Sequence, residues 1–336
     1  MSAREPKPRW DEVPAALRAQ IAEIVGEPIA GGGIAWGGYG PTASFVLTTA
    51  SGAKHFCKGT HPGNTPEGHK AVLRERANLQ RFPELQRFGA AFRGLVEGEG
   101  WHLMLLEAVA RAQAVPPWTP QTVARTIALI TEFHAATPLH AQDALKDIVI
   151  ANLLGRHNWH SLAESAARDR FVALFEDQGA AQAWLDAHLE TLIASTARVA
   201  ACGGPRGWIH GDIRSDNLIF AEGGRLVLVD WPLLSYGPQL LNIAFFLPSL
   251  EGEGGPRCAD ALKLYEEAAS IHFSNDDIAL TVAAVAGFFA ARAGEPEMAA
   301  LPRLRWIQKL QLFPALRWLA QSADIAPPPL PRDFTA

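Results

Sequence analysis

The sequence predicts an α+β fold in which a small N-terminal lobe, built on an antiparallel sheet, precedes a larger and mainly helical C-terminal lobe. Strand-like runs separated by glycine turns gather before residue 107, whereas helical periodicity dominates the sequence from residue 119 onward. The chain has 336 residues, 48% of them hydrophobic, and can bury a substantial core. We therefore expect two lobes, residues 1–107 with a leading helix and residues 108–336.

The first strands of the N-terminal lobe are marked by glycines. Residues 29–40 form a strand-like segment broken by glycines, which allow a backbone to approach phosphates closely. The segment matches neither the Walker A pattern nor a clean Gly-x-Gly-x-x-Gly, so an ordinary turn remains an alternative. Residues 44–49 and 53–58 flank Ser51-Gly52 and predict a hairpin that ends at Lys58.

A helix carrying Glu75 is expected after this hairpin. Residues 67–82 place apolar side chains among charges with the spacing of an amphipathic helix. Glu75 has no Lys or Arg three or four positions away, so a carboxylate beside the apolar stripe needs a partner from elsewhere. Lys58 is the candidate, although a lysine at a strand end is usually solvated. Glu84 is a weaker substitute for Glu75.

Two more strands and a series of helices complete the predicted fold. Residues 92–96 and 101–106 predict strands, and residues 119–136 predict a helix that Pro138 stops. Further helices are expected near residues 171–175, 181–192, 239–250, 260–269, 277–291 and 304–320.

The residues that point to chemistry begin at position 210. Residues 210–217 read His-Gly-Asp-Ile-Arg-Ser-Asp-Asn, and Asp230 follows at the end of an apolar run. Transfer of a phosphoryl group to a hydroxyl needs a carboxylate that accepts the hydroxyl proton and oxygen ligands that hold Mg²⁺. Asp212 suits the first task, and Asn217 and Asp230 suit the second.

A hairpin explains how the two metal ligands meet. Residues 218–220 and 226–229 are apolar and flank Gly223-Gly224, so they should pair and bring Asp230 beside Asn217. Taken singly, Asp212 and Asn217 are ordinary turn or cap residues. Their order together with the hairpin and Asp230 favours a phosphoryl-transfer site.

At these residues the chain resembles the aminoglycoside phosphotransferase and choline kinase superfamily, in a poorly characterised bacterial branch. The family has a bilobal protein-kinase-like fold and a His-Gly-Asp-x-x-x-x-Asn loop with a downstream Asp. The resemblance implies that Asp212 is the catalytic base and that Asn217 and Asp230 hold magnesium. It also implies that Lys58, steadied by Glu75, contacts the phosphates of ATP.

The resemblance further implies that the backbone of Glu107 and Val109 hydrogen-bonds the adenine edge. The Ser/Thr/Tyr protein kinases are less similar, because Trp231 follows Asp230 and an Ala-Pro-Glu segment is lacking. Asn242 stands where the family has an Asp that braces the catalytic loop. Asn keeps an acceptor oxygen but loses the charge, which weakens the expected brace.

Two residues inside the loop keep more than one interpretation. His210 is expected to brace the loop rather than act as a base. Arg214 either contacts the γ-phosphate or pairs with Asp216, and the sequence slightly favours the pairing with Asp216.

Composition and the N-terminal residues indicate the cellular compartment and the partners to expect. Three cysteines form no disulfide or metal pattern, and the N-terminus lacks the apolar core of a secretion signal, so we expect a cytoplasmic protein. The net charge of -5 gives no basic footprint for nucleic acid, and no segment is long enough to span a membrane. The sequence gives no indication of the oligomeric state.

The sequence therefore predicts an ATP- and Mg²⁺-dependent O-phosphotransferase that acts on a hydroxyl of a small molecule. The alternative is a non-catalytic nucleotide-binding scaffold with a kinase-like fold. Asn242 and the irregular glycine segment are the two observations that favour it. An aminoglycoside, a macrolide, an amino alcohol, a sugar and a homoserine-like compound all remain possible acceptors.

Overall fold

The structure, a computed structural model, describes residues 5–36, 40–145, 147–155 and 157–331. The chain divides into two compact units, each built from separate stretches of sequence. Unit 1 comprises residues 1–114, 216–233 and 298–303, and unit 2 comprises the rest. Two late stretches of the sequence thus belong with the N-terminal residues.

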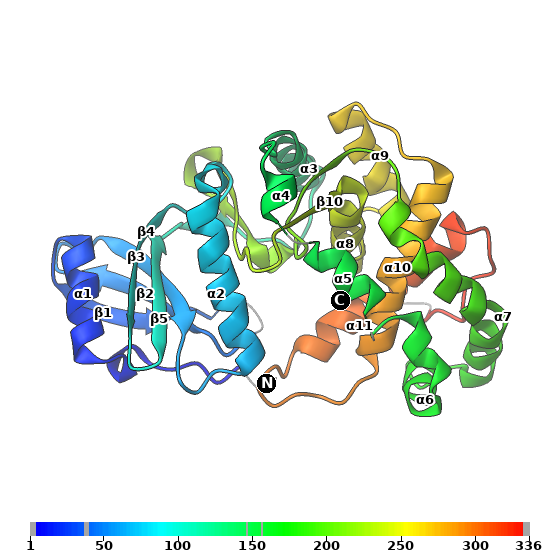
Figure 1. Ribbon diagram of the computed structural model, residues 1–336, viewed down its shortest axis with the longest axis horizontal. Coiled ribbons are helices and arrows are strands. Elements are labelled where there is room, and N and C mark those ends of the chain that lie inside the picture. Colours follow the sequence, from blue (N-terminus) through cyan, green and yellow to red (C-terminus); the bar gives the residue numbers. More distant parts are fainter. Residues whose placement is uncertain (1–4, 37–39, 146, 156, 332–336) are drawn as a thin grey trace. The chain divides into compact units, whose positions relative to one another are not determined.

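A five-stranded antiparallel sheet forms the centre of unit 1 (Figure 1). Its strands are ordered β1-β2-β3-β5-β4 and span β1 Ile29–Ile34, β2 Ala43–Thr49, β3 Lys54–Thr60, β5 Trp101–Glu107 and β4 Phe92–Gly98. The hairpin expected to end at Lys58 continues two residues further, because Gly59 and Thr60 still pair with β5. Lys58 therefore lies inside a strand instead of at its end.

The two faces of this sheet are covered by different helices. Alternate side chains point to opposite faces of a strand, and Phe45, Leu47 and Cys57 face a buried core together with Leu17 and Ile21 of helix α1, Ala15–Val25. Helix α2, Pro66–Arg81, runs along the opposite side of the sheet (Figure 1). The strand alternation places Ser44 and Lys58 on the face away from α1.

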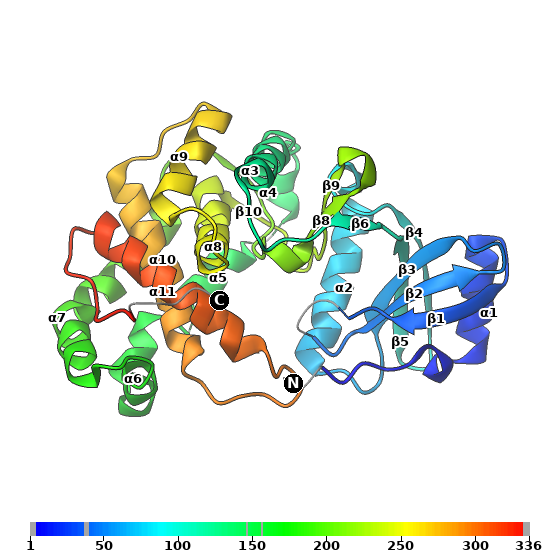
Figure 2. The same cartoon turned by 180° about the vertical axis from the view of Figure 1, so that it is seen from behind.

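A second sheet completes unit 1 (Figure 2). It contains β6 Arg111–Gln113, β8 Leu218–Ala221 and β9 Leu226–Leu228, in the order β6-β8-β9. Gly223 and Gly224 both have positive φ, 68° and 81°, which glycine adopts without steric cost, and they form the turn between β8 and β9. The backbone N–H of Leu228 donates to the carbonyl of Phe88 and ties this hairpin to the segment before β4.

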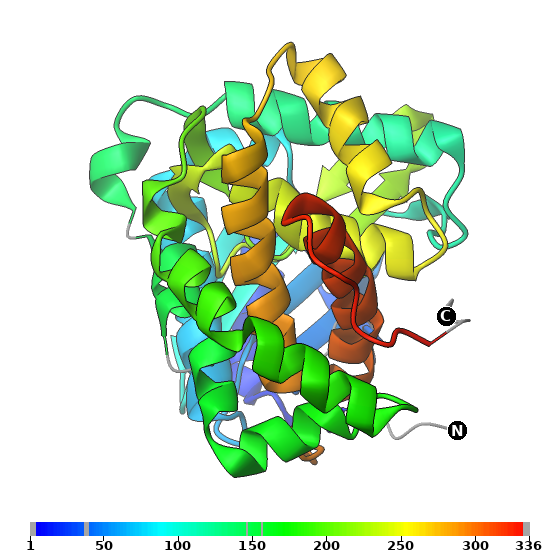
Figure 3. The ribbon, with the colours of Figure 1, turned by 90° about the vertical axis from the view of Figure 1, so that its right-hand side faces the viewer.

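Unit 2 is mainly helical, with a short antiparallel pair formed by β7 Arg206–Ile209 and β10 Ser235–Pro238. Figure 3 shows the long helices α10 and α11, in orange and red, side by side. The α-helices are α3 Pro120–Ala135, α4 Ala141–Ala144, α5 Ile148–Leu154, α6 Ser165–Val172, α7 Gln178–Ala197, α8 Gln239–Gly252, α9 Cys258–Ala269, α10 Asn275–Ala293 and α11 Leu304–Ser322.

The helix expected near residues 171–175 is displaced toward the N-terminus. Helix α6 ends at Val172, and Leu174 and Phe175 follow in turns closed by bonds to the carbonyls three residues earlier. Phe171 and Phe175 still pack edge to face, with ring centroids 5.1 Å apart. The apolar residues were recognised correctly, but their short spacing also fits a turn, so it did not locate the helix end.

Candidate functional site

Three charged side chains meet on the α2 side of the sheet in unit 1. The Nζ atom of Lys58 lies 2.7 Å from Oε2 of Glu75 and 2.5 Å from Oδ1 of Asp230. The side chain of Glu75 is only 3% exposed and that of Lys58 15%, so water screens the pair weakly. Lys58 and Glu75 come together as the sequence predicted, and Asp230 is a second partner of Lys58 that was not foreseen.

The pKa values follow from two carboxylates competing for one ammonium. Burial opposes the charge of Lys58, but Asp230 and Glu75 outweigh it and raise the pKa of the amine. Burial raises the pKa of Glu75, while Lys58 acts in the lowering direction. With all three groups ionised, the cluster carries one negative charge in excess.

Glu75 also fixes the chain just after Asp230. Its Oε1 atom accepts a bond from the backbone N–H of Trp231 at 3.3 Å, and the side chain of Asn78, one helical turn further along α2, donates to the carbonyl of Trp231 at 2.8 Å. One helix therefore holds both Lys58 and the segment that carries Asp230. Glu84, the weaker candidate for this role, is exposed and lies outside α2.

Asp230 stands next to Asn217 because of the β8–β9 ladder. The backbone N–H of Val229 donates to the carbonyl of Asn217 at 3.0 Å and continues the pairing of Leu218 with Leu228. Asp230 has φ of 76°, a conformation that few residues other than glycine adopt and in which Asp is enriched. A strained backbone that the surroundings maintain is common where a side chain is aimed at a ligand.

The residues present fit a magnesium ion. Mg²⁺ prefers oxygen ligands and is commonly bound by one or two side chains together with phosphate oxygens and water. Asn217 and Asp230 offer such oxygens from adjacent positions, and a cation would offset the excess negative charge of the Lys58 cluster. In the described part of the chain, no group of three or more His, Cys, Asp or Glu side chains could hold a metal.

Asp212 belongs to unit 2, in the loop that follows β7. Its Oδ1 atom accepts a bond from Nη1 of Arg214 at 2.6 Å, so the structure gives Arg214 a partner that the sequence did not suggest. His210 is fully buried, and its Nδ1 accepts the backbone N–H of Asp212 at 3.3 Å. This bond suits a histidine that shapes the loop.

Helix α8 supports the same loop at both of its ends. In its first turn, Oδ1 of Asn242 accepts the backbone N–H groups of His210 and Gly211 at 3.0 and 3.2 Å. Past its last residue, the carboxylate of Glu253 accepts bonds from Ser215 Oγ at 2.6 Å and from the indole of Trp118 at 2.9 Å. Sequence reasoning missed Glu253, because a carboxylate after a helix carries no signal of its distant partners.

Asn242, which is uncharged where the family has an Asp, is hydrogen-bonded to a histidine that is itself neutral. The Asn242 amide donates to Nε2 of His134 at 2.8 Å, so His134 carries its proton on Nδ1, 2.6 Å from the hydroxyl of Tyr265. Tyr265 in turn donates to Gln239 at 3.3 Å. Burial lowers the pKa of His134 to about 3, so the network stays uncharged at neutral pH.

This histidine should make the protein sensitive to acid. An unfolded His titrates near ~6.5, so between that pH and about 3 the unfolded chain binds a proton that the folded chain rejects. The free energy of unfolding should therefore fall as pH falls, by about 1.4 kcal/mol per pH unit from this group. Urea unfolding at pH 7 and pH 5 should show a smaller difference for His134→Gln than for the parent. Exposed His160→Gln is the control, and parallel curves for His134→Gln and the parent would contradict the assignment.

Glu107 is the last residue of β5, and its carboxylate and backbone N–H have partners within unit 1. Its carboxylate accepts two bonds from Arg225, at 2.5 and 3.1 Å, and its backbone N–H donates to the carbonyl of Ala91 at 2.9 Å. Arg225 lowers the pKa of this carboxyl. The side chain thus joins β5 to the β8–β9 hairpin, and its carbonyl with the backbone of Val109 remains the predicted adenine contact.

Packing requires one of the glycines in residues 29–40, which the sequence did not show. A Cβ atom at Gly32 would lie 2.5 Å from the Trp10 ring, so the glycine makes room for that indole. Gly37, Gly38 and Tyr39, part of the segment considered for phosphate contact, lie outside the described residues.

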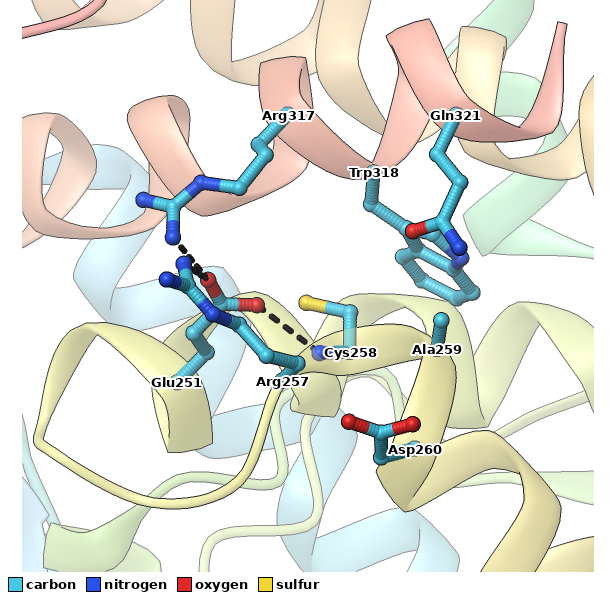
Figure 4. A pocket seen from close by; sticks show the side chains of 8 residues that line it. All are labelled: Glu251, Arg257, Cys258, Ala259, Asp260, Arg317, Trp318 and Gln321. Atoms are coloured by element: carbon cyan, nitrogen blue, oxygen red, sulfur yellow. Dashed lines mark hydrogen bonds and ion pairs between the residues drawn. The ribbon is translucent and has the colours of Figure 1, made fainter. Parts of the chain in front are cut away.

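A cavity of about 180 Å³ lies elsewhere, within unit 2 (Figure 4). Glu251 accepts bonds there from Arg257, Arg317 and the backbone N–H of Cys258, at 2.9, 3.0 and 2.8 Å. The other lining residues are Ala259, Asp260, Trp318 and Gln321. Among the described residues that line it, none belongs to the predicted site, and the bond from Cys258 to Glu251 satisfies a backbone N–H at the start of α9.

The chain belongs to the phosphotransferase enzyme family (APH), whose sequence profile matches residues 34–274. The match covers the β1 end, the Lys58 cluster, the 210–217 loop and α8. The match confirms the phosphotransferase family that the sequence motifs indicated.

Solved structures show the same kinase-like fold. A spectinomycin phosphotransferase in complex with ADP and spectinomycin has a TM-score of 0.60 at 11% identity, with 91% of this chain and 98% of that chain covered. An aminoglycoside phosphotransferase from Alicyclobacillus acidocaldarius gives 0.56 at 19% identity and coverages of 88% and 92%. The choline kinase from Streptococcus pneumoniae gives 0.56 at 14% identity and coverages of 91% and 98%.

No curated protein matches the chain significantly. Within the described ranges, none of the helices combines the length and the apolar character needed to cross a bilayer.

Proposed function

We propose that the protein is an ATP- and Mg²⁺-dependent O-phosphotransferase that acts on a hydroxyl of a small molecule. The observation that carries the proposal is the cluster in which Lys58 lies between the buried Glu75 and the partly exposed Asp230, with Asn217 beside it. Such a cluster suits a cationic metal and a phosphate ligand better than it suits a purely structural role. Three buried free cysteines, Cys57, Cys202 and Cys258, agree with a cytoplasmic setting.

The residues have separate tasks in this proposal. Lys58, held by Glu75, contacts the phosphates of ATP, and the backbone of Glu107 and Val109 contacts the adenine edge. Asn217 and Asp230 hold Mg²⁺, which supplies positive charge against the phosphates when it is bound.

Asp212 handles the proton. The acceptor hydroxyl gives its proton to the Asp212 carboxylate while its oxygen forms a bond to the γ-phosphorus and the bond to the β-phosphate oxygen breaks. The products are ADP and the phosphorylated alcohol. Arg214 orients the carboxylate through its bond to Oδ1. His210, Asn242 and Glu253 keep the loop in shape.

A small acceptor is supported by two similar solved structures, the spectinomycin phosphotransferase with bound spectinomycin and an aminoglycoside phosphotransferase with bound AMP-PNP and hygromycin B. The scaffold alternative was motivated by Asn242, yet this side chain still accepts both loop N–H groups that a charged brace would hold. The bonds that position Asp212 are thus compatible with turnover.

Calorimetry with ATP, with and without Mg²⁺, tests the proposal. We expect tighter binding in the presence of Mg²⁺ and a loss of that difference in Asp230→Ala, because Asp230 is one of two proposed protein ligands. Exposed Glu222→Ala at the tip of the same hairpin is the matched control. Equal affinity with and without Mg²⁺, or tight Mg·ATP binding without ADP release across a broad library of hydroxyl compounds, would count against the enzyme.

A further inference from the structure

The N-terminal segment of residues 5–12 precedes the family match yet is firmly held in unit 1. The carboxylate of Glu5, only 2% exposed, accepts two bonds from the guanidinium of Arg303, each 2.8 Å long. At the other end, Trp10 packs edge to face on Phe45, with ring centroids 5.5 Å apart, and covers Gly32. The segment is therefore anchored on both sides of Lys7.

Lys7 is directed to the edge of the sheet that carries Lys58. Its Nζ donates to the carbonyl of Ala35, just past β1, at 3.1 Å. The backbone N–H of Ala35 donates to the backbone carbonyl of Ser44, and Ser44 pairs with Lys58 in the β2–β3 ladder. Neighbouring strands lie about 4.8 Å apart, so two strand spacings, roughly 10 Å, separate the backbones of Ala35 and Lys58.

Electrostatics link Lys7 to the same cluster. Burial lowers the pKa of Lys7 to about 8, Glu5 and Asp230 act in the raising direction, and Lys58 and Arg303 act in the lowering direction. The amine thus remains mostly protonated at pH 7, in a partly desolvated place where the charges of Lys58 and Asp230 are felt. An anion placed between the two ammonium groups would relieve their repulsion.

We propose that Lys7 is a second phosphate-binding lysine, which contacts the β- or γ-phosphate of the bound nucleoside triphosphate. The inference rests on the proposed function, because it takes Lys58 as the first phosphate contact. The bond to the carbonyl of Ala35 fixes the position of the Lys7 ammonium at this edge of the sheet.

The charge of the Lys58 cluster explains the need for Lys7. Glu75 and Asp230 more than neutralise Lys58, so this cluster offers a triphosphate no net positive charge. Together with the Mg²⁺ proposed at Asn217 and Asp230, Lys7 supplies that charge from outside the cluster, and its anchors Glu5 and Trp10 keep the ammonium in place.

Calorimetry with ATP, ADP and AMP tests the assignment. Lys7→Gln should lower the affinity for Mg·ATP about 10-fold, the size expected for a charge-assisted bond, and should leave the affinity for AMP within about twofold of the parent. Lys7→Arg should retain most of the Mg·ATP affinity, because it keeps the charge. Exposed Lys54→Gln, on the same sheet, is the matched control and should bind all three nucleotides like the parent.

The outcomes separate the two proposals. Unchanged Mg·ATP binding by Lys7→Gln, or an equal loss for ATP and AMP, overturns the role of Lys7 and leaves the proposed function standing. A parent protein that binds no Mg·ATP overturns the proposed function and the role of Lys7 together.

Discussion

Replacing Asp212 by Asn is expected to lower turnover by about 10²- to 10⁴-fold, the usual contribution of a positioned general base. An amide cannot accept the hydroxyl proton, while its size and its acceptor oxygen preserve the loop and the bond from Arg214. Nucleotide affinity should stay close to that of the parent. The measurement is ADP release with an accepted hydroxyl compound, beside calorimetry with Mg·ATP.

Two further variants show whether the loss comes from the proton acceptor. Arg214→Gln breaks the ion pair but keeps the carboxylate, so its loss of turnover should be smaller than that of Asp212→Asn. Asp169→Asn, an exposed change of the same chemistry on α6, should behave like the parent. Turnover by Asp212→Asn at the parent rate would show that Asp212 is not the base.

The largest effect on stability is expected from Lys58→Met. The substitution leaves the buried carboxylate of Glu75 and the partly exposed carboxylate of Asp230 without their shared cation. Removal of one partner from a buried ion pair typically costs about 3–5 kcal/mol, because the remaining charge stays desolvated. Urea-induced unfolding at neutral pH should show this decrease in the free energy of unfolding.

A double variant tests whether uncompensated charge causes the loss of stability in Lys58→Met. Adding Glu75→Gln to Lys58→Met removes one of the two uncompensated carboxylates and should recover part of the lost stability. Lys54→Met, at the exposed start of the same strand, should change stability by less than about 0.5 kcal/mol. A Lys58→Met protein as stable as the parent would contradict the charge balance described for the cluster.

The parts of the site that lie on regular ladders could be predicted from the sequence. The glycine turn and its flanking apolar runs predicted the β8–β9 hairpin, whose pairing puts Asn217 beside the residues that lead to Asp230. The absence of helix neighbours for Glu75 correctly indicated a partner outside α2, and Lys58 lies 2.7 Å away. Local periodicity is sufficient in these cases because both partners occupy strongly patterned elements.

Contacts between residues far apart in the sequence could not be predicted. Nothing near Asn242 indicates that its amide meets His134, 108 positions earlier, or that the pair remains neutral. Glu5 likewise gives no sign of Arg303, 298 positions away. Arg214 was expected to pair with Asp216, its second neighbour on one side, and its bond to Asp212, the second neighbour on the other, was not foreseen. Spacing alone does not distinguish these two carboxylates.

The division of the chain has a practical consequence for anyone who wishes to study one unit alone. A fragment that ends at residue 114 would keep Lys58 and Glu75 but would lack Asn217 and Asp230, which return to unit 1 within residues 216–233. It would also lose Arg303 and expose the buried carboxylate of Glu5. A single cut of the gene therefore cannot yield an intact unit 1. An autonomous version would need all three stretches joined by new linkers.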